Sequence, residues 1–277
     1  MGLSIKSKIK LNNGVEVPVL GFGTLHAQGE IAQKAMIWAY EAGYRHMDTA
    51  KAYGNESDVG KAFKKCGLPR EEVFITTKLW NDDHGYDTAL KAIDTSLRNL
   101  GLDYVDLYLI HWPVSGRRVE TWKAMERILK DGKAQAIGVS NFTIRHLEEL
   151  LKEAETVPAV NQIEYTPYLY QKRLQEYCEG KGIKIEAWSP LTRGIKLDDP
   201  KLVEVARRYD KSPAQILIRW GLQHGVISIP KSVHRERIIE NAQVFDFDIS
   251  EGDMRRLDNF NENLRTSGWD PESEKFR

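Results

Sequence analysis

A regular alternation of short apolar segments with longer amphipathic segments constrains the fold of this chain more than any other feature of its sequence. Short apolar runs are typical of buried β-strands, and apolar residues three or four positions apart are typical of helices that pack one face on a sheet. Strands are predicted at residues 19–23, 45–48, 73–79, 105–111, 134–140, 159–164, 183–189 and 225–230. The helices that follow them are predicted at residues 31–42, 56–66, 88–100, 120–130, 144–154, 174–181, 200–209 and 236–243.

Eight strand-and-helix units in one chain predict an α/β protein with a (β/α)8 TIM barrel. A doubly wound sheet is the alternative, but the segment GFGTLHA lacks the third glycine of the GxGxxG fingerprint. Before the first unit, KIKLNNGVEVPVL predicts a β-hairpin closed by a tight Asn-Gly turn. Extra helices are predicted at residues 213–224 and 250–259. Because no Pro-, Gly- or Ser-rich linker divides the chain, we expect residues 1–277 to form one domain.

Composition limits the classes of partner. Lys plus Arg and Asp plus Glu each number 40, so the net charge is zero and nothing favours binding to nucleic acid. No apolar run approaches the ~18 residues of a membrane span, and MGLSIKSKIK lacks the apolar core of a signal peptide. Cys66 and Cys178 are too few for a disulfide framework, which favours a reducing compartment. We expect a cytoplasmic monomer whose partner is a small molecule.

Polar residues stand at the ends of the predicted strands, where a barrel of this kind carries its chemistry. In strand order, these residues are Gly23 and Thr24, Asp48 with Tyr53 just beyond, Lys78, His111, Ser140 and Asn141, Gln162 and Glu164, Trp188 and Ser189, and Lys231 and Ser232. Taken singly, each has an ordinary structural explanation, such as a helix cap or a satisfied core histidine. Their coincidence at one end of the barrel points to a site.

Four of these residues predict a way to reduce a carbonyl group without a metal. Lys78 follows apolar strand residues, so its charge needs a partner, and Asp48 at the end of the neighbouring strand is the obvious one. A lysine cation near Tyr53 should lower the pKa of the phenol toward the working range and make it a general acid. His111 can donate to the same substrate oxygen. The sequence contains no HExxH motif or paired cysteine ligands, so no metal site is predicted.

These residues and motifs resemble those of the aldo-keto reductase superfamily. GYRHMDTAKAYGNE resembles the first signature of the family and IPKSVHRERIIEN its third, with HWP, GVSNF, NQIE and WSPL between them in the family order. The resemblance extends from Val19 to about Phe247 and is closest to the bacterial-type branch that includes 2,5-diketo-gluconate and methylglyoxal reductases. It implies an NADP-dependent oxidoreductase with Asp48, Tyr53, Lys78 and His111 as catalytic residues and Tyr53 as the proton donor.

The resemblance also implies how a nicotinamide cofactor would bind. Family members hold the nicotinamide carboxamide with residues at the positions of Ser140, Asn141 and Gln162, and stack an aromatic residue at the position of Trp188 on the ring. Cations at the positions of Lys231 and Arg237 bind the 2′-phosphate, which favours NADPH and leaves NADH possible but weaker. The alternative for Arg237 is an ordinary charged helix face. The expected cofactor-binding residues are Gly23, Thr24, Asp48, Ser140, Asn141, Gln162, Trp188, Ser189, Pro190, Leu191, Lys231, Ser232, Val233, Arg237, Glu240 and Asn241.

The substrate implied by the resemblance is a small dicarbonyl, a keto sugar acid or an aromatic aldehyde. The residues expected to line its pocket are Leu25, Trp80, His111 and Trp112. Two other functions stay open at this point. Lys78 could form a Schiff base in a lyase, or the chain could be a non-catalytic subunit that only binds NADPH.

Overall fold

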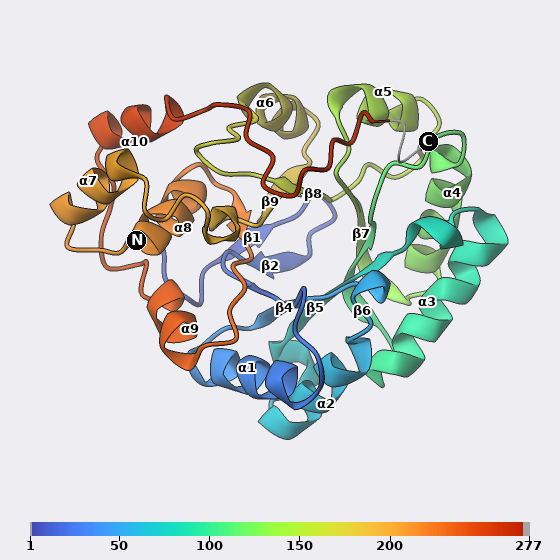
Figure 1. Cartoon of the computed structure of the whole chain (residues 1–277). Helices are drawn as coiled ribbons and strands as arrows, with labels where there is room; N and C mark the ends of the chain where they lie inside the picture. Colours follow the sequence, from blue (N-terminus) through green and yellow to red (C-terminus); the bar gives the residue numbers. More distant parts are fainter. Residues whose placement is uncertain (1, 274–277) are drawn as a thin grey trace.

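Eight parallel strands form a closed ring in the structure, a computed structural model that describes residues 2–273 (Figure 1). Each strand pairs with the next along the chain, in the order β3 (Phe22–Gly23), β4 (His46–Asp48), β5 (Phe74–Leu79), β6 (Val105–Ile110), β7 (Ala134–Ser140), β8 (Val160–Glu164), β9 (Lys184–Trp188) and β10 (Ile227–Ser228). The ring closes where Gly21 N donates to Ser228 O at 2.8 Å and Ser228 N donates to Val19 O at 3.0 Å. The predicted (β/α)8 barrel is confirmed.

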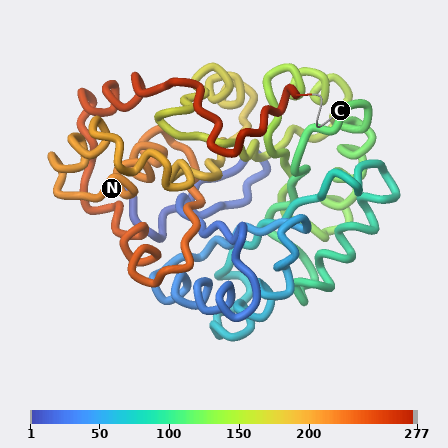
Figure 2. Tube along the Cα trace, in the orientation of Figure 1, coloured from blue at the N-terminus to red at the C-terminus, as the bar shows by residue number. Residues whose placement is uncertain are grey.

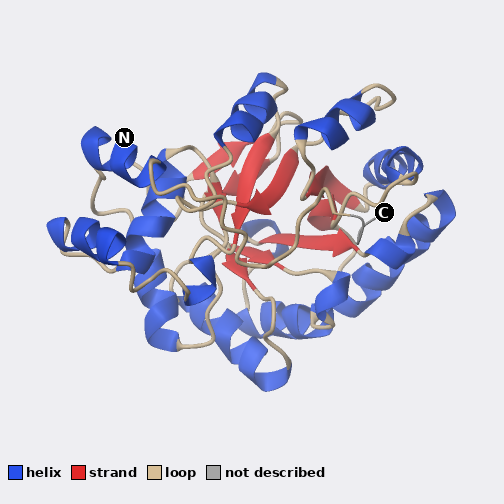
Figure 3. Cartoon of the chain, turned by 45° about the horizontal axis from the view of Figure 1, so that its top comes forward, coloured by secondary structure: helices blue, strands red, loops and turns tan. Residues whose placement is uncertain are grey.

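Helices surround the strands on the outside of the barrel (Figure 3). The α-helices are α1 (Gly29–Glu41), α2 (Glu56–Cys66), α3 (Tyr86–Leu100), α4 (Arg118–Lys130), α5 (Ile144–Leu151), α6 (Lys172–Gly180), α7 (Pro200–Arg208), α8 (Pro213–Gln223), α9 (Arg235–Ala242) and α10 (Glu251–Asp258). Short 3-10 helices are η1 (Lys51–Tyr53), η2 (Arg70–Glu72), η3 (Asn81–Asp83) and η4 (Thr192–Gly194). Most predicted boundaries lie within two residues of these.

Two helices after β9 have exchanged roles relative to the sequence prediction. We predicted that residues 200–209 would cover the barrel and that residues 213–224 would be extra. Instead α8 packs on β10 while α7 packs on α8 from outside. Every residue from Gln215 to Leu222 in α8 is buried. Both helices begin with a capped proline turn, Asp199-Pro200 and Ser212-Pro213, so their start signals are equally strong and do not tell which one faces the sheet.

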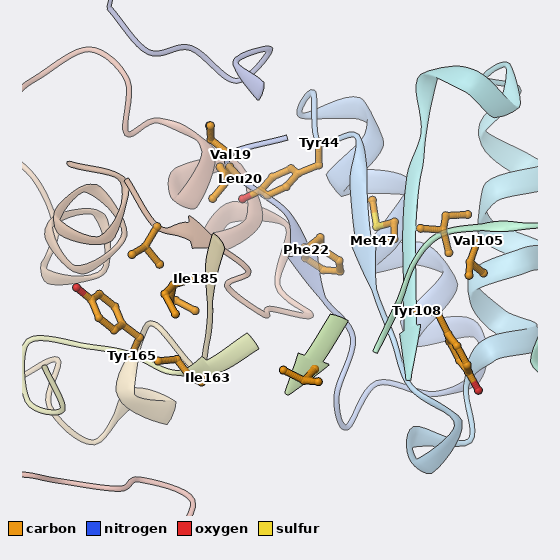
Figure 4. Packing of buried hydrophobic residues seen from close by; sticks show 14 of the residues in the cluster. Val19, Leu20, Phe22, Tyr44, Met47, Val105, Tyr108, Ile163, Tyr165 and Ile185 are labelled. Carbon is orange, nitrogen blue, oxygen red and sulfur yellow. The ribbon is translucent and has the colours of Figure 1, made fainter. Parts of the chain in front are cut away.

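Alternation along the strands separates two environments. Outward residues such as Met47, Tyr108, Ile163 and Ile185 pack against the helices (Figure 4). Most inward residues nearer the strand starts are apolar and include Phe74, Leu107, Ala136 and Val160. The exceptions are His46 and Thr76, which are polar and fully buried. Inward residues nearer the strand ends are polar and buried, and they include Asp48, Lys78, Gln162 and Glu186. The barrel therefore has an apolar floor and a polar upper layer.

The predicted N-terminal hairpin closes the floor of the barrel. Strands β1 (Lys8–Lys10) and β2 (Glu16–Pro18) pair antiparallel, and Gly14 takes a positive φ of 91° in the turn. Leu11 and Val17 of the hairpin pack in one cluster with Phe74, Leu107 and Val160 of the barrel floor. Figure 2 shows the blue hairpin through the centre of the ring. Within residues 2–273, no helix is long and apolar enough to cross a membrane.

Candidate active site

The four predicted catalytic residues meet at the ends of three adjacent strands. Asp48 ends β4, Lys78 lies near the end of β5, and His111 directly follows β6. Tyr53 ends η1, the turn that leads from β4 to α2. The ring of Tyr53 packs edge-on against His111, with 5.7 Å between their centroids. Residues as far apart in the sequence as 48 and 111 therefore lie close together, because consecutive strands are parallel neighbours and their ends meet.

Lys78 and Asp48 form a completely buried ion pair. Lys78 Nζ donates to Asp48 Oδ1 at 2.7 Å, to Asp48 Oδ2 at 2.8 Å and to the backbone oxygen of Thr49 at 2.8 Å. Burial alone would lower the pKa of Lys78, but the nearby Asp48 carboxylate and Tyr53 phenol outweigh burial and raise it. Burial raises the pKa of Asp48, and Lys78 opposes that rise. The pairing predicted from neighbouring strands is the one the structure contains.

The pKa of Tyr53 differs from the sequence expectation. Lys78 Nζ lies 3.5 Å from the phenol oxygen of Tyr53 and 5.0 Å from the centre of its ring. We predicted that this cation would lower the pKa. Burial instead raises the pKa of Tyr53 above its usual value, and the cation only opposes this effect. The prediction was wrong in sign because the sequence does not reveal how deeply the phenol lies. Tyr53 therefore holds its proton at neutral pH.

His111 is a neutral imidazole beside Tyr53. Burial, assisted by the positive charge of Lys78, lowers the pKa of His111 well below its usual value. The buried Nδ1 atom of His111 has no hydrogen-bond partner among residues 2–273. Trp80 packs edge-on against the imidazole at 5.2 Å between centroids. A neutral histidine in this position can donate one hydrogen bond to a substrate oxygen.

The residues expected at the nicotinamide form one connected network at the ends of β7, β8 and β9. Ser140 Oγ donates to the backbone oxygen of Gln162 at 2.8 Å. Asn141 takes a positive φ of 64° and donates through Nδ2 to the backbone oxygen of His111 at 2.9 Å. Trp188 Nε1 donates to Asn141 Oδ1 at 2.9 Å, which fixes the indole at the rim. Trp188 is only half-buried, and an aromatic ring held beside amide groups suits stacking on a nicotinamide ring.

The loop after β10 and the first turn of α9 each carry a cation, Lys231 and Arg237. Neither Lys231 nor Arg237 forms an ion pair with a carboxylate within residues 2–273, while Lys231 is half-buried and burial lowers its pKa. Such cations suit a bound phosphate group. Ser232 Oγ accepts from the backbone N–H of His234 at 3.1 Å, which shapes the loop between them.

The other predicted cofactor residues lie on or after β3, after β9, and on or before α9. Thr24 Oγ1 donates to the backbone oxygen of Asp48 at 2.9 Å. Gly23 lies so close to β10 that an added Cβ would come within 3.0 Å of the backbone oxygen of Ile229. The remaining residues are Ser189, Pro190 and Leu191 after β9, and Val233, Glu240 and Asn241 on or before α9.

Aromatic residues cluster around Tyr53 and His111. Trp80 and Trp112 flank His111, and Leu25 lies half-buried in the loop after β3. Trp269 packs on Trp112 with 5.2 Å between ring centroids. Sequence reasoning left Trp269 unassigned, because nothing in the tail sequence indicates that it returns to the strand ends.

The segment that carries Trp269 is held over the barrel by Glu164. This carboxylate, at the end of β8, accepts hydrogen bonds from the backbone N–H of Thr266 at 2.7 Å, from Thr266 Oγ1, and from Ser267 Oγ at 3.1 Å. In Figure 1 the red segment crosses from α10 toward α5. Glu272 then binds Thr143 and Arg145 at the start of α5.

Glu186 is a further buried carboxyl group that sequence reasoning passed over. It lies in the strand predicted at residues 183–189, where an acidic residue at an inward position is itself a signal. Gln162 Nε2 donates to Glu186 Oε1 at 2.5 Å and to Asp48 Oδ2 at 2.8 Å. Glu186 is therefore linked to the ion pair of the site through one amide.

Known proteins resemble this chain along most of its length. Residues 19–262 match the family model described as the aldo/keto reductase family. The chain is 52% identical over 266 residues to glyoxal reductase from Bacillus subtilis (strain 168), covering 96% of each protein. An aldo/keto reductase crystal structure from Brucella melitensis is 46% identical, with a TM-score of 0.89 and coverage of 92% of this chain and 99% of that one. A Bombyx mori aldo-keto reductase solved in complex with NADP is 38% identical, with a TM-score of 0.89 and coverage of 95% of each chain.

Proposed function

This chain belongs to the aldo/keto reductase family, and on that premise we propose that it reduces a small carbonyl compound with NADPH, using Tyr53 as the proton donor. The observation that carries the proposal is the convergence of Tyr53, the buried Lys78–Asp48 pair and neutral His111 at the strand ends. The protein is an oxidoreductase, and its cofactor is NADPH.

Each of the four residues has a distinct task. NADPH supplies the hydride to the carbonyl carbon when it is bound. Tyr53 gives its proton to the carbonyl oxygen, and the cation of Lys78, 3.5 Å away, stabilises the phenolate that remains. Asp48 keeps Lys78 charged. His111 donates a hydrogen bond to the oxygen as negative charge develops there.

Ser140, Asn141, Gln162 and Trp188 would hold the nicotinamide, and Lys231 with Arg237 would hold the 2′-phosphate. The support for the first group is the amide network beside a half-buried indole. The support for the second is a pair of cations that no carboxylate within residues 2–273 neutralises.

A small dicarbonyl is the substrate class we favour. The relative that is 52% identical is named glyoxal reductase. The aromatic rings of Trp80 and Trp112 contact His111, and Trp269 packs on Trp112, so the neighbourhood of His111 is aromatic. Keto sugar acids and aromatic aldehydes are the other candidates. The structure disfavours a Schiff base on Lys78, because four oxygen atoms of Asp48, Thr49 and Tyr53 surround its Nζ and its pKa is raised.

We further propose that residues 1–277 form one domain that acts as a cytoplasmic monomer and binds no nucleic acid. The balance of 40 basic and 40 acidic residues supports the last point. Both cysteines are free, which is consistent with a reducing compartment. Size-exclusion chromatography with light scattering tests the oligomeric state.

The test is NADPH oxidation by the purified protein with methylglyoxal, a 2-keto sugar acid and an aromatic aldehyde, each repeated with NADH. We expect turnover, and we expect it to be faster with NADPH than with NADH.

In parallel, Tyr53→Phe should keep the dissociation constant for NADPH and lose at least about 100-fold in kcat, because the proton donor is gone. A kcat near that of the wild type would overturn the assignment of Tyr53. Binding of NADPH without turnover of any substrate would favour the non-catalytic alternative.

A further inference from the structure

Glu186 has no task in the reaction described above, although it lies in the polar layer of the barrel. It is the central residue of β9, and its outward neighbours Ile185 and Ala187 pack against the helices. Its own side chain therefore points inward and is completely buried. In the sheet, Gln162 of β8 lies directly beside it in register.

The contacts of Gln162 define the orientation of its amide group. One end of the amide lies 2.5 Å from Glu186 Oε1 and 2.8 Å from Asp48 Oδ2. An amide oxygen at this point would lie 2.8 Å from an oxygen of the charged Asp48 carboxylate and would be repelled by it. The NH2 group must occupy the position, and both of its hydrogens are used there. The carbonyl oxygen Oε1 of Gln162 is thus the atom left to accept a hydrogen bond from a ligand.

The charge state of Glu186 follows from its surroundings. The charged groups acting on it are Asp48 from β4 and Lys78 from β5, and Lys78 is already bound to Asp48. Its neighbours in register are the neutral amide of Gln162 on β8 and the apolar Ile227 on β10. Burial and the negative charge of Asp48 raise the pKa of Glu186 to about 8. At neutral pH the group is mostly protonated, and its carbonyl oxygen can still accept from Gln162.

We propose that Glu186 is a positioning residue for the cofactor: by accepting one amide hydrogen of Gln162, it holds the Gln162 carbonyl oxygen ready to accept from the nicotinamide carboxamide. The inference rests on the proposed function, in which Gln162 contacts that group. Asp48 alone would satisfy one hydrogen of the amide and leave the second unpaired in a dry interior. Glu186 supplies the second acceptor, so only one orientation of the amide is fully bonded.

A purely structural role for Glu186 is the competing explanation, and the same barrel offers a matched comparison. His46 Nε2 and Thr76 Oγ1 form a hydrogen bond of 3.0 Å on the inner faces of β4 and β5, and both residues are fully buried. Neither side chain hydrogen-bonds to Gln162. Thr76→Val removes a buried hydrogen bond from the barrel while leaving the Gln162 amide untouched.

The experiment compares Glu186→Met, Glu186→Gln and Thr76→Val with the wild type by measuring dissociation constants for NADP+ and NADPH from tryptophan fluorescence. Met has a similar length but its sulfur is only a weak hydrogen-bond acceptor, so we expect binding to weaken about tenfold. Gln offers an amide oxygen to Gln162 and should recover most of this loss. Thr76→Val should melt at a lower temperature than the wild type and bind both cofactors with unchanged affinity.

A pH series adds a readout that a structural role would not change. As pH rises from about 7 to about 9, Glu186 becomes an anion, while His111 stays neutral and Tyr53 stays protonated. A negative charge on Glu186 strengthens binding of NADP+, whose nicotinamide ring is positively charged, relative to NADPH, whose ring is neutral. Both cofactors carry the 2′-phosphate, so its contribution to binding cancels in the ratio of their dissociation constants. The ratio of the NADP+ to the NADPH dissociation constant should fall in the wild type and stay constant in Glu186→Gln.

The outcomes separate the two levels of inference. If folded Glu186→Met binds both cofactors as the wild type does, the positioning role is wrong while the proposed function stands. An equal pH dependence in Glu186→Gln and the wild type would likewise overturn it. If the wild type itself binds neither cofactor, the proposed function fails first. Should Glu186→Met not fold, the comparison of Glu186→Gln with the wild type across the pH series still decides.

Discussion

At the scale of single residues, unpaired charges give the sharpest test of the cofactor assignment. Lys231→Gly combined with Arg237→His should weaken NADPH binding about 100-fold, because charge-assisted contacts to the 2′-phosphate are lost. NADH lacks that phosphate, so its dissociation constant should change far less. Arg235→His is the matched control, since Arg235 lies on the same helix and faces Glu41 at 3.9 Å. Equal losses for both cofactors would refute the assignment of a phosphate site.

Residue pairs that follow from strand order could be predicted from the sequence, whereas properties set by depth could not. The Asp48–Lys78 pair was predictable because consecutive parallel strands are neighbours. The direction of the Tyr53 pKa shift was not, because it depends on burial of the phenol. Glu186 was missed for a related reason. Gln162 is its neighbour on the preceding strand, but Asp48, which shares the Gln162 amide, comes from a distant part of the sequence.

At the scale of elements, the ends of the segment from Leu264 to Glu272 are bonded to Tyr168, Thr143 and Arg145, and its centre is bonded to the carboxylate of Glu164. Glu164→Ala should remove three hydrogen bonds and free the segment locally, lowering its opening free energy by about 2 kcal/mol. Hydrogen exchange should show faster exchange at the Thr266 amide. Because Trp269 packs on Trp112, KM for an aromatic aldehyde should rise severalfold with a smaller change in kcat.

Glu251→Ala provides the control, because Glu251 lies on α10 with its side chain 94% exposed. Unchanged exchange at Thr266 in Glu164→Ala would show that other contacts hold the segment.

The packing of whole helices is harder to predict from the sequence than their boundaries. The boundaries of α7 and α8 were predicted well, but which of them faces β10 was not, because both have one apolar face and a capped start.

At the scale of the whole molecule, a neutral histidine inside the barrel links stability to pH. Burial, assisted by Lys78, lowers the pKa of His46 to about 3, whereas an unfolded histidine titrates near ~6.5. Below about pH 6.5 the histidine becomes protonated in the unfolded chain while it stays neutral in the folded barrel. The folded state therefore loses stability as the pH falls from about 6.5 toward the folded pKa. Because of His46, the free energy of unfolding of the wild type should be about 2 kcal/mol lower at about pH 5 than at about pH 7.

Urea unfolding of the wild type and His46→Gln at both pH values isolates this effect, since the other titrating groups cancel in the difference. The stability deficit of His46→Gln should shrink by about 2 kcal/mol from about pH 7 to about pH 5. Thr76→Val loses the same hydrogen bond but keeps the histidine, so its deficit should not shrink. A constant deficit in both variants would show that His46 becomes protonated in the folded barrel.

The seam of the barrel also dictates an order of events during synthesis. Residues 19–23 can bond to the last strand only after Ser228 and Pro230 have left the ribosome, when all the other strands of the barrel have been translated. Until then the nascent sheet has two open edges, and the polar upper layer stays in contact with water. Lys78 and Asp48 can pair early, as neighbours on consecutive strands, while Gln162 and Glu186 reach them last. Exclusion of water from the catalytic centre is therefore among the final steps in the folding of the enzyme.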